Sequence, residues 1–188
     1  MKVLLINSSP NQSGHCACAA EDLAARLNTH QIESELFWLG QGDIRGCLSC
    51  YKCLEIDRCV QDTDRVNELA EKMIASDGII VCAPVYFGGP NGALCNAFDR
   101  IFYSRTVKNQ LFKGKPAGAI TVCNTMGAET ALMGIYRYFS TCQMPIVSGI
   151  GFPTLTMAMT EEKNDRYHTV INAIADNMAE LVKQRSGC

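Results

Sequence analysis

Apolar residues gather in short runs that alternate with amphipathic stretches. Runs of strand length, rich in Val, Ile and Phe, occupy 2–7, 34–39, 78–86, 118–124 and, more weakly, 144–152. Between and after them, apolar residues recur at helical spacing in 16–28, 62–76, 91–103, 128–140 and 161–184. Asp62 and Thr63 are cap candidates for the second helix, and Thr160 for the last. Because continuous apolar runs are typical of parallel strands buried on both faces, the order predicts an α/β fold. We expect a doubly wound, five-stranded parallel sheet flanked by helices on both faces.

The 188 residues show no internal repeat and no linker. They therefore predict a single domain, 1–188, with a cysteine-rich loop at 45–62. Ligands of such sheets bind beyond the carboxyl ends of the strands, near the point where the strand order reverses. The loops to inspect are thus 8–15, 84–92 and 124–128, together with the cysteine-rich loop.

Composition and charge narrow the classes of partner. Hydrophobic residues make up 47% of the chain, and the net charge is −2. This balance gives no reason to expect nucleic acid or a membrane as partner. The apolar run near the start, Val3–Ile6, is too short for a signal or a membrane span, so we expect a cytoplasmic protein. Eleven cysteines, an odd number, argue against a secreted disulfide framework.

The segment SSPNQSGHC at 8–16 joins a predicted strand to a predicted helix. Its hydroxyl, amide and backbone donors at a helix N-terminus could bind a phosphate, with His15 as the only histidine in a position to help. The segment lacks a basic residue and matches neither G-x-x-x-x-G-K-[ST] nor G-x-G-x-x-G. An ordinary polar turn would fit the same residues.

The segment APVYFGGPNG at 83–92 combines aromatic and apolar residues with a glycine-rich turn. A planar ligand could rest on such an edge, with Met126 of the 124–129 segment as a soft contact. A plain strand end followed by a turn would fit the segment as well.

Cys47, Cys50, Cys53 and Cys59 form the pattern C-x2-C-x2-C-x5-C. A [4Fe–4S] cube needs four thiolates from a loop that can wrap around it, and the spacing supplies them in one segment. Zinc normally uses two separated pairs and fits less well. The pattern is also compatible with redox-active thiols, or with cysteines that bind nothing.

The remaining cysteines have simpler interpretations. We expect Cys82 and Cys123 in the core, Cys95 and Cys142 packed on or near helices, and Cys188 exposed at the terminus. Cys16 and Cys18 are expected to pack beside the phosphate loop. Asp99 and Arg100 are expected to form a stabilising ion pair near the end of a helix, and no side chain is assigned as general acid or base.

Together these loops resemble the NADPH-dependent FMN reductase family of flavodoxin-like proteins. NSSPNQSGHC resembles its G-S-P-R-x-x-G-N-T phosphate loop: Ser9, Pro10 and Gly14 match, while Asn11 replaces Arg and Cys16 replaces Thr or Ser. PVYFGGPNGALCNAFDR at 84–100 resembles P-V-Y-F-G-x-x-x-x-x-L-K-x-x-x-D-R, with Cys95 in place of the lysine. Within the family, the cysteine pattern resembles that of the iron–sulfur flavoproteins.

The resemblance implies a flavodoxin-like fold, non-covalent FMN and a homodimer or homotetramer. The residues that would contact FMN are Ser8, Ser9, Asn11, Ser13, Gly14, His15, Cys16, Pro84, Val85, Tyr86, Phe87, Gly88, Asn124, Thr125, Met126 and Gly127. The four loop cysteines would hold one [4Fe–4S] cluster that exchanges electrons with FMN. A ferredoxin-like protein or NAD(P)H would be the donor and a small molecule the acceptor. The rival functions are a cluster-free NAD(P)H-dependent FMN or quinone reductase and a non-catalytic redox carrier or sensor.

Overall fold

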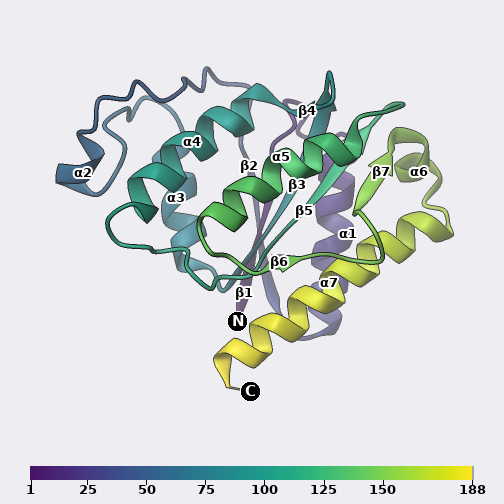
Figure 1. The fold of residues 1–188 in the computed structure, drawn as a ribbon. Helices are drawn as coiled ribbons and strands as arrows, with labels where there is room; N and C mark the ends of the chain where they lie inside the picture. Colours follow the sequence, from purple (N-terminus) through teal and green to yellow (C-terminus); the bar gives the residue numbers. More distant parts are fainter. Residues whose placement is uncertain (188) are drawn as a thin grey trace.

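A parallel β-sheet forms the centre of the molecule in this computed structural model, which describes residues 1–187 (Figure 1). Cys188, which we expected to be exposed at the terminus, lies outside the described residues. The sheet order is β2-β1-β3-β5-β6, and every neighbouring pair along it is parallel. These strands are β1 (Lys2–Asn7), β2 (Glu33–Trp38), β3 (Gly78–Tyr86), β5 (Ala117–Cys123) and β6 (Ile146–Val147). The predicted α/β flavodoxin-like fold with five parallel strands is confirmed.

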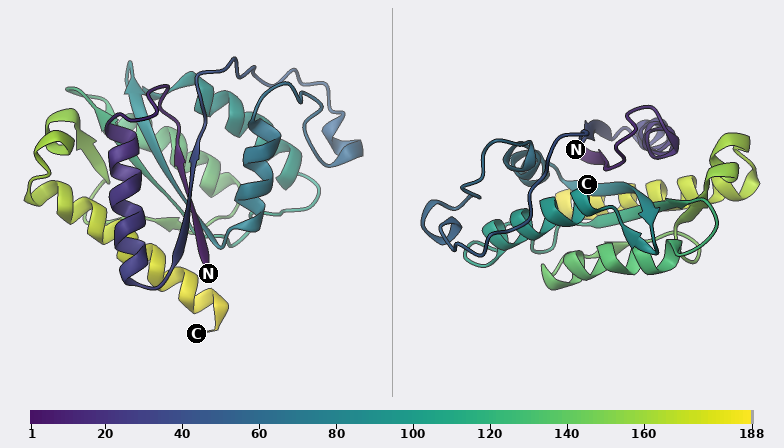
Figure 2. Two further views of the ribbon diagram at one scale, coloured as in Figure 1. Left: turned by 180° about the vertical axis from the view of Figure 1, so that it is seen from behind. Right: turned by 90° about the horizontal axis from the view of Figure 1, so that it is seen from above.

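Helices cover both faces of the sheet (Figures 1 and 2). One face carries α1 (His15–Thr29) and α7 (Asp165–Ser186), and the other carries α3 (Val66–Ala75), α4 (Gly92–Thr106) and α5 (Ala128–Thr141). Successive strand residues point to opposite faces, so Val3 and Leu5 pack with α1 and α7 while Leu4 and Ile6 pack with the other helices. This double burial explains why the central strands have no polar alternation.

The predicted strand at 144–152 is wrong as one element. Within this run only β6 is a strand of the sheet, and it pairs with β5 at Ala117 and Gly118. A second short strand, β7 (Thr154–Thr156), lies just beyond the run and pairs with β5 further along. The chain between them leaves the sheet through a bridge from Gly149 to Gly151. A continuous apolar run therefore does not require continuous pairing.

The predicted helix at 161–184 is also two helices, α6 (Met157–Glu162) and α7. Lys163 has a left-handed backbone that ends α6, and the Asn164 side chain accepts from Tyr167 N–H to begin α7. Thr160 does not cap a helix, because its hydroxyl donates to Thr156 O inside α6.

Two elements differ from expectation around the cysteine-rich loop. A single helical turn, α2 (Cys53–Ile56), lies within it. The helix expected at 62–76 begins only at Val66, whose N–H is accepted by Asp64 rather than by Asp62 or Thr63. The remaining short strand, β4 (Gly89–Pro90), makes an antiparallel hairpin with the end of β3.

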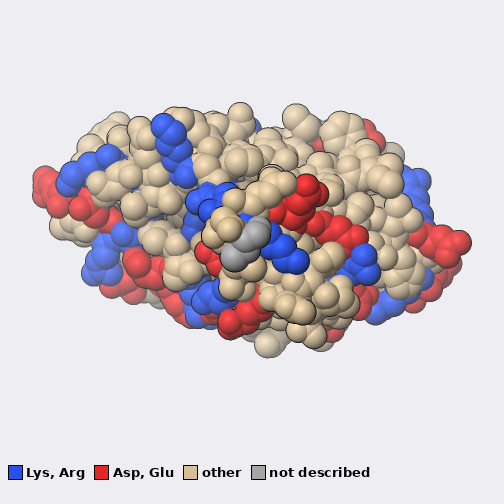
Figure 3. All heavy atoms as spheres, turned by 90° about the horizontal axis from the view of Figure 1, so that it is seen from below, with Lys and Arg blue, Asp and Glu red and all other residues tan. Residues whose placement is uncertain are grey.

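Charged side chains of both signs are interspersed on the face at the amino ends of the strands (Figure 3). Among residues 1–187, no helix has both the length and the apolar character needed to cross a membrane. The candidate chemistry lies at the opposite end of the sheet.

Candidate functional site

The strand order reverses between β1 and β3, and the loops that follow these two strands are joined directly. Ser8 N–H donates to Cys82 O at 3.0 Å. The Ser8 hydroxyl donates to Asn91 Oδ1 at 2.9 Å, and Asn91 Nδ2 donates back to Ser8 O at 2.8 Å. Ser8 and Asn91 are both buried, so these bonds are protected from water. They fix the start of the first loop against the start of α4.

The loop after β1 is shaped by a relay of short-range hydrogen bonds. Asn7 Oδ1 accepts from Ser9 N–H, Ser9 Oγ accepts from Asn11 N–H, and Asn11 Oδ1 accepts from Ser13 N–H. Asn11 also lies over Gly14, where an added Cβ would lie 2.9 Å from Asn11 Nδ2. A side chain at position 14 would therefore displace the Asn11 side chain that shapes the loop.

The first turn of α1 presents free backbone donors. Ala17 and Cys18 donate to Gly14 O, whereas the N–H groups of Gly14, His15 and Cys16 have no partner within residues 1–187. The His15 ring lies 3.6 Å from Glu161, and the Cys16 side chain is buried in the core. Burial raises the pKa of the Cys16 thiol to about 12, so this thiol is neutral near pH 7. An anion could therefore meet donors and no ionised thiol here.

The loops after β3 and β5 approach each other closely. Gly127 has φ of +83°, and an added Cβ would lie 2.6 Å from Gly88 Cα. Beside this contact Phe87 is fully exposed with φ of +50°, and Met126 is 79% exposed. Backbone held in the left-handed region by a bulky residue costs free energy, and such outliers cluster at ligand sites. The two loops thus lie against each other and present exposed apolar side chains.

A third segment completes this region and was missed by the sequence reasoning. Gly40, Gln41 and Gly42 follow β2 and line a hollow of about 170 Å³ with Ser8, Pro10 and Tyr86. Gln41 Nε2 donates to Pro10 O at 2.8 Å. The sequence signal that could have identified this segment is its turn, Gly40-Gln41-Gly42, which directly follows the predicted strand at 34–39.

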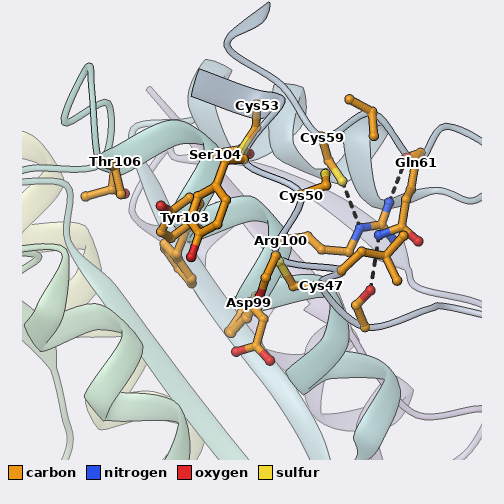
Figure 4. A pocket seen from close by; sticks show the side chains of 18 of the residues that line it. Cys47, Cys50, Cys53, Cys59, Gln61, Asp99, Arg100, Tyr103, Ser104 and Thr106 are labelled. Atoms are coloured by element: carbon orange, nitrogen blue, oxygen red, sulfur yellow. Dashed lines mark hydrogen bonds between the residues drawn. The ribbon is translucent and has the colours of Figure 1, made fainter. Parts of the chain in front are cut away.

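The cysteine-rich loop and α4 enclose a larger cavity of about 680 Å³ (Figure 4). All four cysteines of the motif line it, together with Arg100 and Tyr103 of α4. Ser49, Tyr51 and Asp57 have φ of 50°, 57° and 56°, so the loop turns sharply three times. The structure therefore brings the four predicted ligands to one cavity.

The four cysteine side chains differ in exposure. Cys47 and Cys50 are exposed, and Cys53 and Cys59 are half-buried. Burial raises the pKa of Cys53, and its three partner cysteines add to the rise. Within residues 1–187, no group of three His, Cys, Asp or Glu side chains is arranged to hold a metal ion. The cysteines thus share a cavity without standing in ligand geometry.

Arg100 connects this loop to α4 and was not expected to do so. Its guanidinium pairs with Asp64, not with Asp99, and its Nε donates to Cys59 Sγ at 3.2 Å. Asp99 instead accepts from the Tyr138 hydroxyl at 2.6 Å. The expected Asp99–Arg100 pair is wrong because neighbours on a helix point about 100° apart.

The remaining cysteines follow the simpler interpretations. Cys82 and Cys123 are buried in strands, Cys142 is buried after α5, and Cys95 is half-buried on α4. Cys18 lies 3.9 Å from the Tyr167 hydroxyl, and His30 pairs with Asp176 at the surface between α1 and α7.

Comparison with known proteins gives several relatives. The chain is 32% identical over 157 residues to an iron-sulfur flavoprotein of Methanocaldococcus jannaschii, covering 82% of this chain and 79% of that protein. An iron-sulfur flavoprotein of Methanosarcina thermophila is 31% identical, covering 78% and 77%. An FMN-dependent NADPH-azoreductase of Staphylococcus aureus is 32% identical over 120 residues, covering 64% and 59%.

Solved structures agree on the fold. A flavone reductase superposes with a TM-score of 0.76 at 17% identity, covering 99% of this chain and 64% of that one. The family description NADPH-dependent FMN reductase matches residues 1–154, which include every loop described above. The chain belongs to the NADPH-dependent FMN reductase family.

Proposed function

We propose that this protein is an FMN-dependent oxidoreductase that carries one [4Fe–4S] cluster on Cys47, Cys50, Cys53 and Cys59. It would pass electrons between a one-electron donor, such as a ferredoxin-like protein, and FMN, which then reduces a small molecule. The observation that carries the proposal is that all four cysteines line one cavity in a chain of an FMN reductase family. Two relatives named iron-sulfur flavoproteins support the same assignment.

The residues at the flavin side fit FMN. The free N–H groups of Gly14, His15 and Cys16 at the start of α1 suit a phosphate, since the helix dipole favours an anion there. Ser9, Asn11 and Ser13 hold that loop in shape, while the buried Ser8 fixes its first residue. No side-chain cation is needed for a bound, unreacting phosphate.

The ring of FMN would rest on the apolar edge formed by the loops after β3 and β5. Pro84–Gly88 would support it from one loop and Asn124–Gly127 from the other, and the contact between Gly88 and Gly127 sets their spacing. Tyr86, Phe87 and Met126 would contribute the exposed apolar surface that a planar ring covers.

The residues of the cysteine-rich loop fit a cluster by their chemistry. Four thiols converge on one cavity, and one of them, Cys59, accepts an N–H from a buried arginine. Hydrogen bonds to ligand sulfur are among the factors that set cluster potentials. The four thiols would have to rearrange within the cavity to form the ligand set.

The bound groups would supply the electron chemistry: FMN accepts electrons singly or in pairs, and a cluster transfers them singly. The protein's own residues would position and shield them. Burial in the 84–88 and 124–127 loops would hold the ring, and α4 would hold the cysteine loop. We infer no proton transfer by a side chain.

The main rival is a cluster-free NAD(P)H-dependent FMN or quinone reductase. It is favoured by the family itself, by the azoreductase relative and by the absence of ligand geometry among the cysteines of residues 1–187. A non-catalytic redox carrier or sensor is the third candidate. In each case we propose a cytoplasmic protein, because a reducing compartment suits the exposed thiols of Cys47 and Cys50. We also propose a homodimer or homotetramer, as the resemblance to the family implies.

Anaerobic purification followed by an optical spectrum and an iron assay tests the proposal. We expect flavin bands above a broad iron–sulfur absorption and about four irons per chain. Flavin without iron, even after anaerobic reconstitution with iron and sulfide, would exclude the cluster and leave the reductase. Turnover with NAD(P)H or a reduced ferredoxin then separates an enzyme from a sensor.

A further inference from the structure

Arg100 is the largest fully buried side chain in the described structure, and its three guanidinium nitrogens all donate at the cysteine-rich loop. Nη2 donates to Gln61 O at 2.7 Å, and Nη1 donates to Arg45 O at 3.2 Å. Nε donates to Cys59 Sγ at 3.2 Å, and the pair with Asp64 balances the charge. One guanidinium therefore ties the beginning of the loop, its end and one of its cysteines to α4. Figure 4 shows Arg100 beside Cys59 and Gln61.

Two other side chains of α4 also donate to backbone carbonyls in or next to the cysteine-rich loop. Asn96 Nδ2 donates to Ile44 O at 2.7 Å, and Arg105 donates to Asp57 O. Positions 96 and 100 are four residues apart and lie on one side of the helix, whereas Arg105 lies about 140° around the helix from Arg100. Asn91, at the N-cap of the same helix, holds Ser8 at the start of the loop after β1. A single helix therefore braces both loop regions.

We propose that Arg100 is the positioning residue of the cysteine-rich loop: it holds both ends of the loop on α4 and, once a cluster is bound, raises its reduction potential through Cys59. The second half rests on the proposed function, while the first concerns the protein without a cluster.

The sign of the potential shift follows from charge. A reduced cluster carries one more negative charge than an oxidised one, so a nearby cation and an N–H donor to a ligand sulfur favour the reduced form. Arg100 supplies both from a buried position. Replacing it also leaves Asp64 as a buried anion without its partner, which shifts the potential in the same negative direction.

The first test uses the FMN-loaded protein without a cluster. Arg45, Lys52 and Arg58 are trypsin sites within or beside the loop, so hydrogen exchange over 45–62 and cleavage at these sites report its opening. We expect Arg100→Gln to accelerate hydrogen exchange and tryptic cleavage of the loop by about tenfold or more, with FMN affinity unchanged. The rates of Arg100→Lys should lie between those of the wild type and of Arg100→Gln. Arg26→Gln is the matched control, because Arg26 forms a bidentate pair with Asp176 between α1 and α7.

The second test measures the midpoint potential of the reconstituted cluster by redox titration monitored by electron paramagnetic resonance. We expect a negative shift in Arg100→Gln and partial recovery in Arg100→Lys. In the double variant Arg100→Gln with Asp64→Asn the shift is smaller than in Arg100→Gln alone, because the orphaned carboxylate is gone.

Unchanged exchange over 45–62 in Arg100→Gln would overturn the positioning role, whatever the cluster result. An opened loop with an unchanged potential would overturn the tuning role and leave Arg100 as a brace. If the wild-type protein binds no iron, the proposed function fails, and the exchange experiment still decides whether Arg100 holds the loop.

Discussion

The flavin-side loops and the cysteine-rich loop are held in different ways. The loop after β1 is shaped by hydrogen bonds between residues two apart, and the loops after β3 and β5 meet backbone to backbone at Gly88 and Gly127. The 45–62 loop is instead held by side chains of α4, 39 to 55 residues away in sequence. Local bonding makes the loop after β1 readable from a short motif, whereas the cysteine-rich loop depends on residues that no motif within it reveals.

This difference also predicts which changes affect which site. Substitutions in the flavin-side loops should alter FMN binding without affecting the cysteine-rich loop. Substitutions at the four cysteines of the 45–62 loop, or at α4 residues that contact this loop, should alter the loop without affecting FMN binding.

The largest expected effect is loss of the cluster. Cys50→Ser removes a thiolate that a four-iron cube requires, so we expect iron binding to be abolished while FMN stays bound. Iron and flavin assays on the anaerobically reconstituted protein measure both. Cys95→Ser is the control, because Cys95 lies on α4 outside the cavity lining. Stoichiometric iron in Cys50→Ser would show that Cys50 is not a ligand.

The next effect separates the two sites from the flavin side. Gly127→Ala places a Cβ against Gly88 in a backbone conformation with φ of +83°, which costs about 1–3 kcal/mol if the loops keep their position. We expect FMN affinity to fall by about tenfold, measured by fluorescence titration, with exchange over 45–62 unchanged. Gly114→Ala is the control, because Gly114 has a similar φ of +75° but precedes β5 at the end of the sheet away from the flavin; it should bind FMN as the wild type does.

A smaller effect is expected on the α4 side. Asn96→Ala removes one hydrogen bond to Ile44 O, worth about 1 kcal/mol, so opening of the cysteine-rich loop should become about fivefold more frequent. Hydrogen exchange over 45–62 measures it. Asn177, on α7, donates a comparable side-chain hydrogen bond to Ser148 O, so Asn177→Ala should leave hydrogen exchange over 45–62 unchanged. Equal exchange in the two variants would contradict bracing by α4.

The smallest effect concerns pH. Burial raises the pKa of Cys16 from 9.0 to about 12, so above pH 9 the unfolded thiol releases its proton and the folded one does not. The free energy of unfolding therefore falls as pH rises from about 9 to 12. Urea denaturation of the FMN-free protein at pH 8 and at pH 9.5 measures this fall. In Cys16→Ala the fall should be smaller than in the wild type, by less than ~1 kcal/mol. Equal slopes would show that Cys16 is accessible to solvent.

Sequence patterns were sufficient for the central sheet because strands buried on both faces leave a continuous apolar signal. The runs at 2–7 and 78–86 match β1 and β3. The alternation of strand and helix patterns along the chain predicted a doubly wound fold. The pattern failed at 144–152 and 161–184. There, departure of the chain from the sheet after β6 and the left-handed Lys163 depend on local backbone geometry that apolar periodicity does not register.

The sequence by itself determined the fold class, because each strand and helix leaves a local apolar pattern and their order is read directly along the chain. It likewise determined the four-cysteine motif and the loops that follow the strands, because these are short consecutive segments. Only the tertiary structure decided that Arg100 pairs with Asp64 and contacts Cys59, that Asn91 fastens Ser8, and that Gly127 meets Gly88. The physical reason is distance along the chain. These contacts join residues 36 to 83 positions apart, and they exist only once the sheet has brought the carboxyl ends of its strands together.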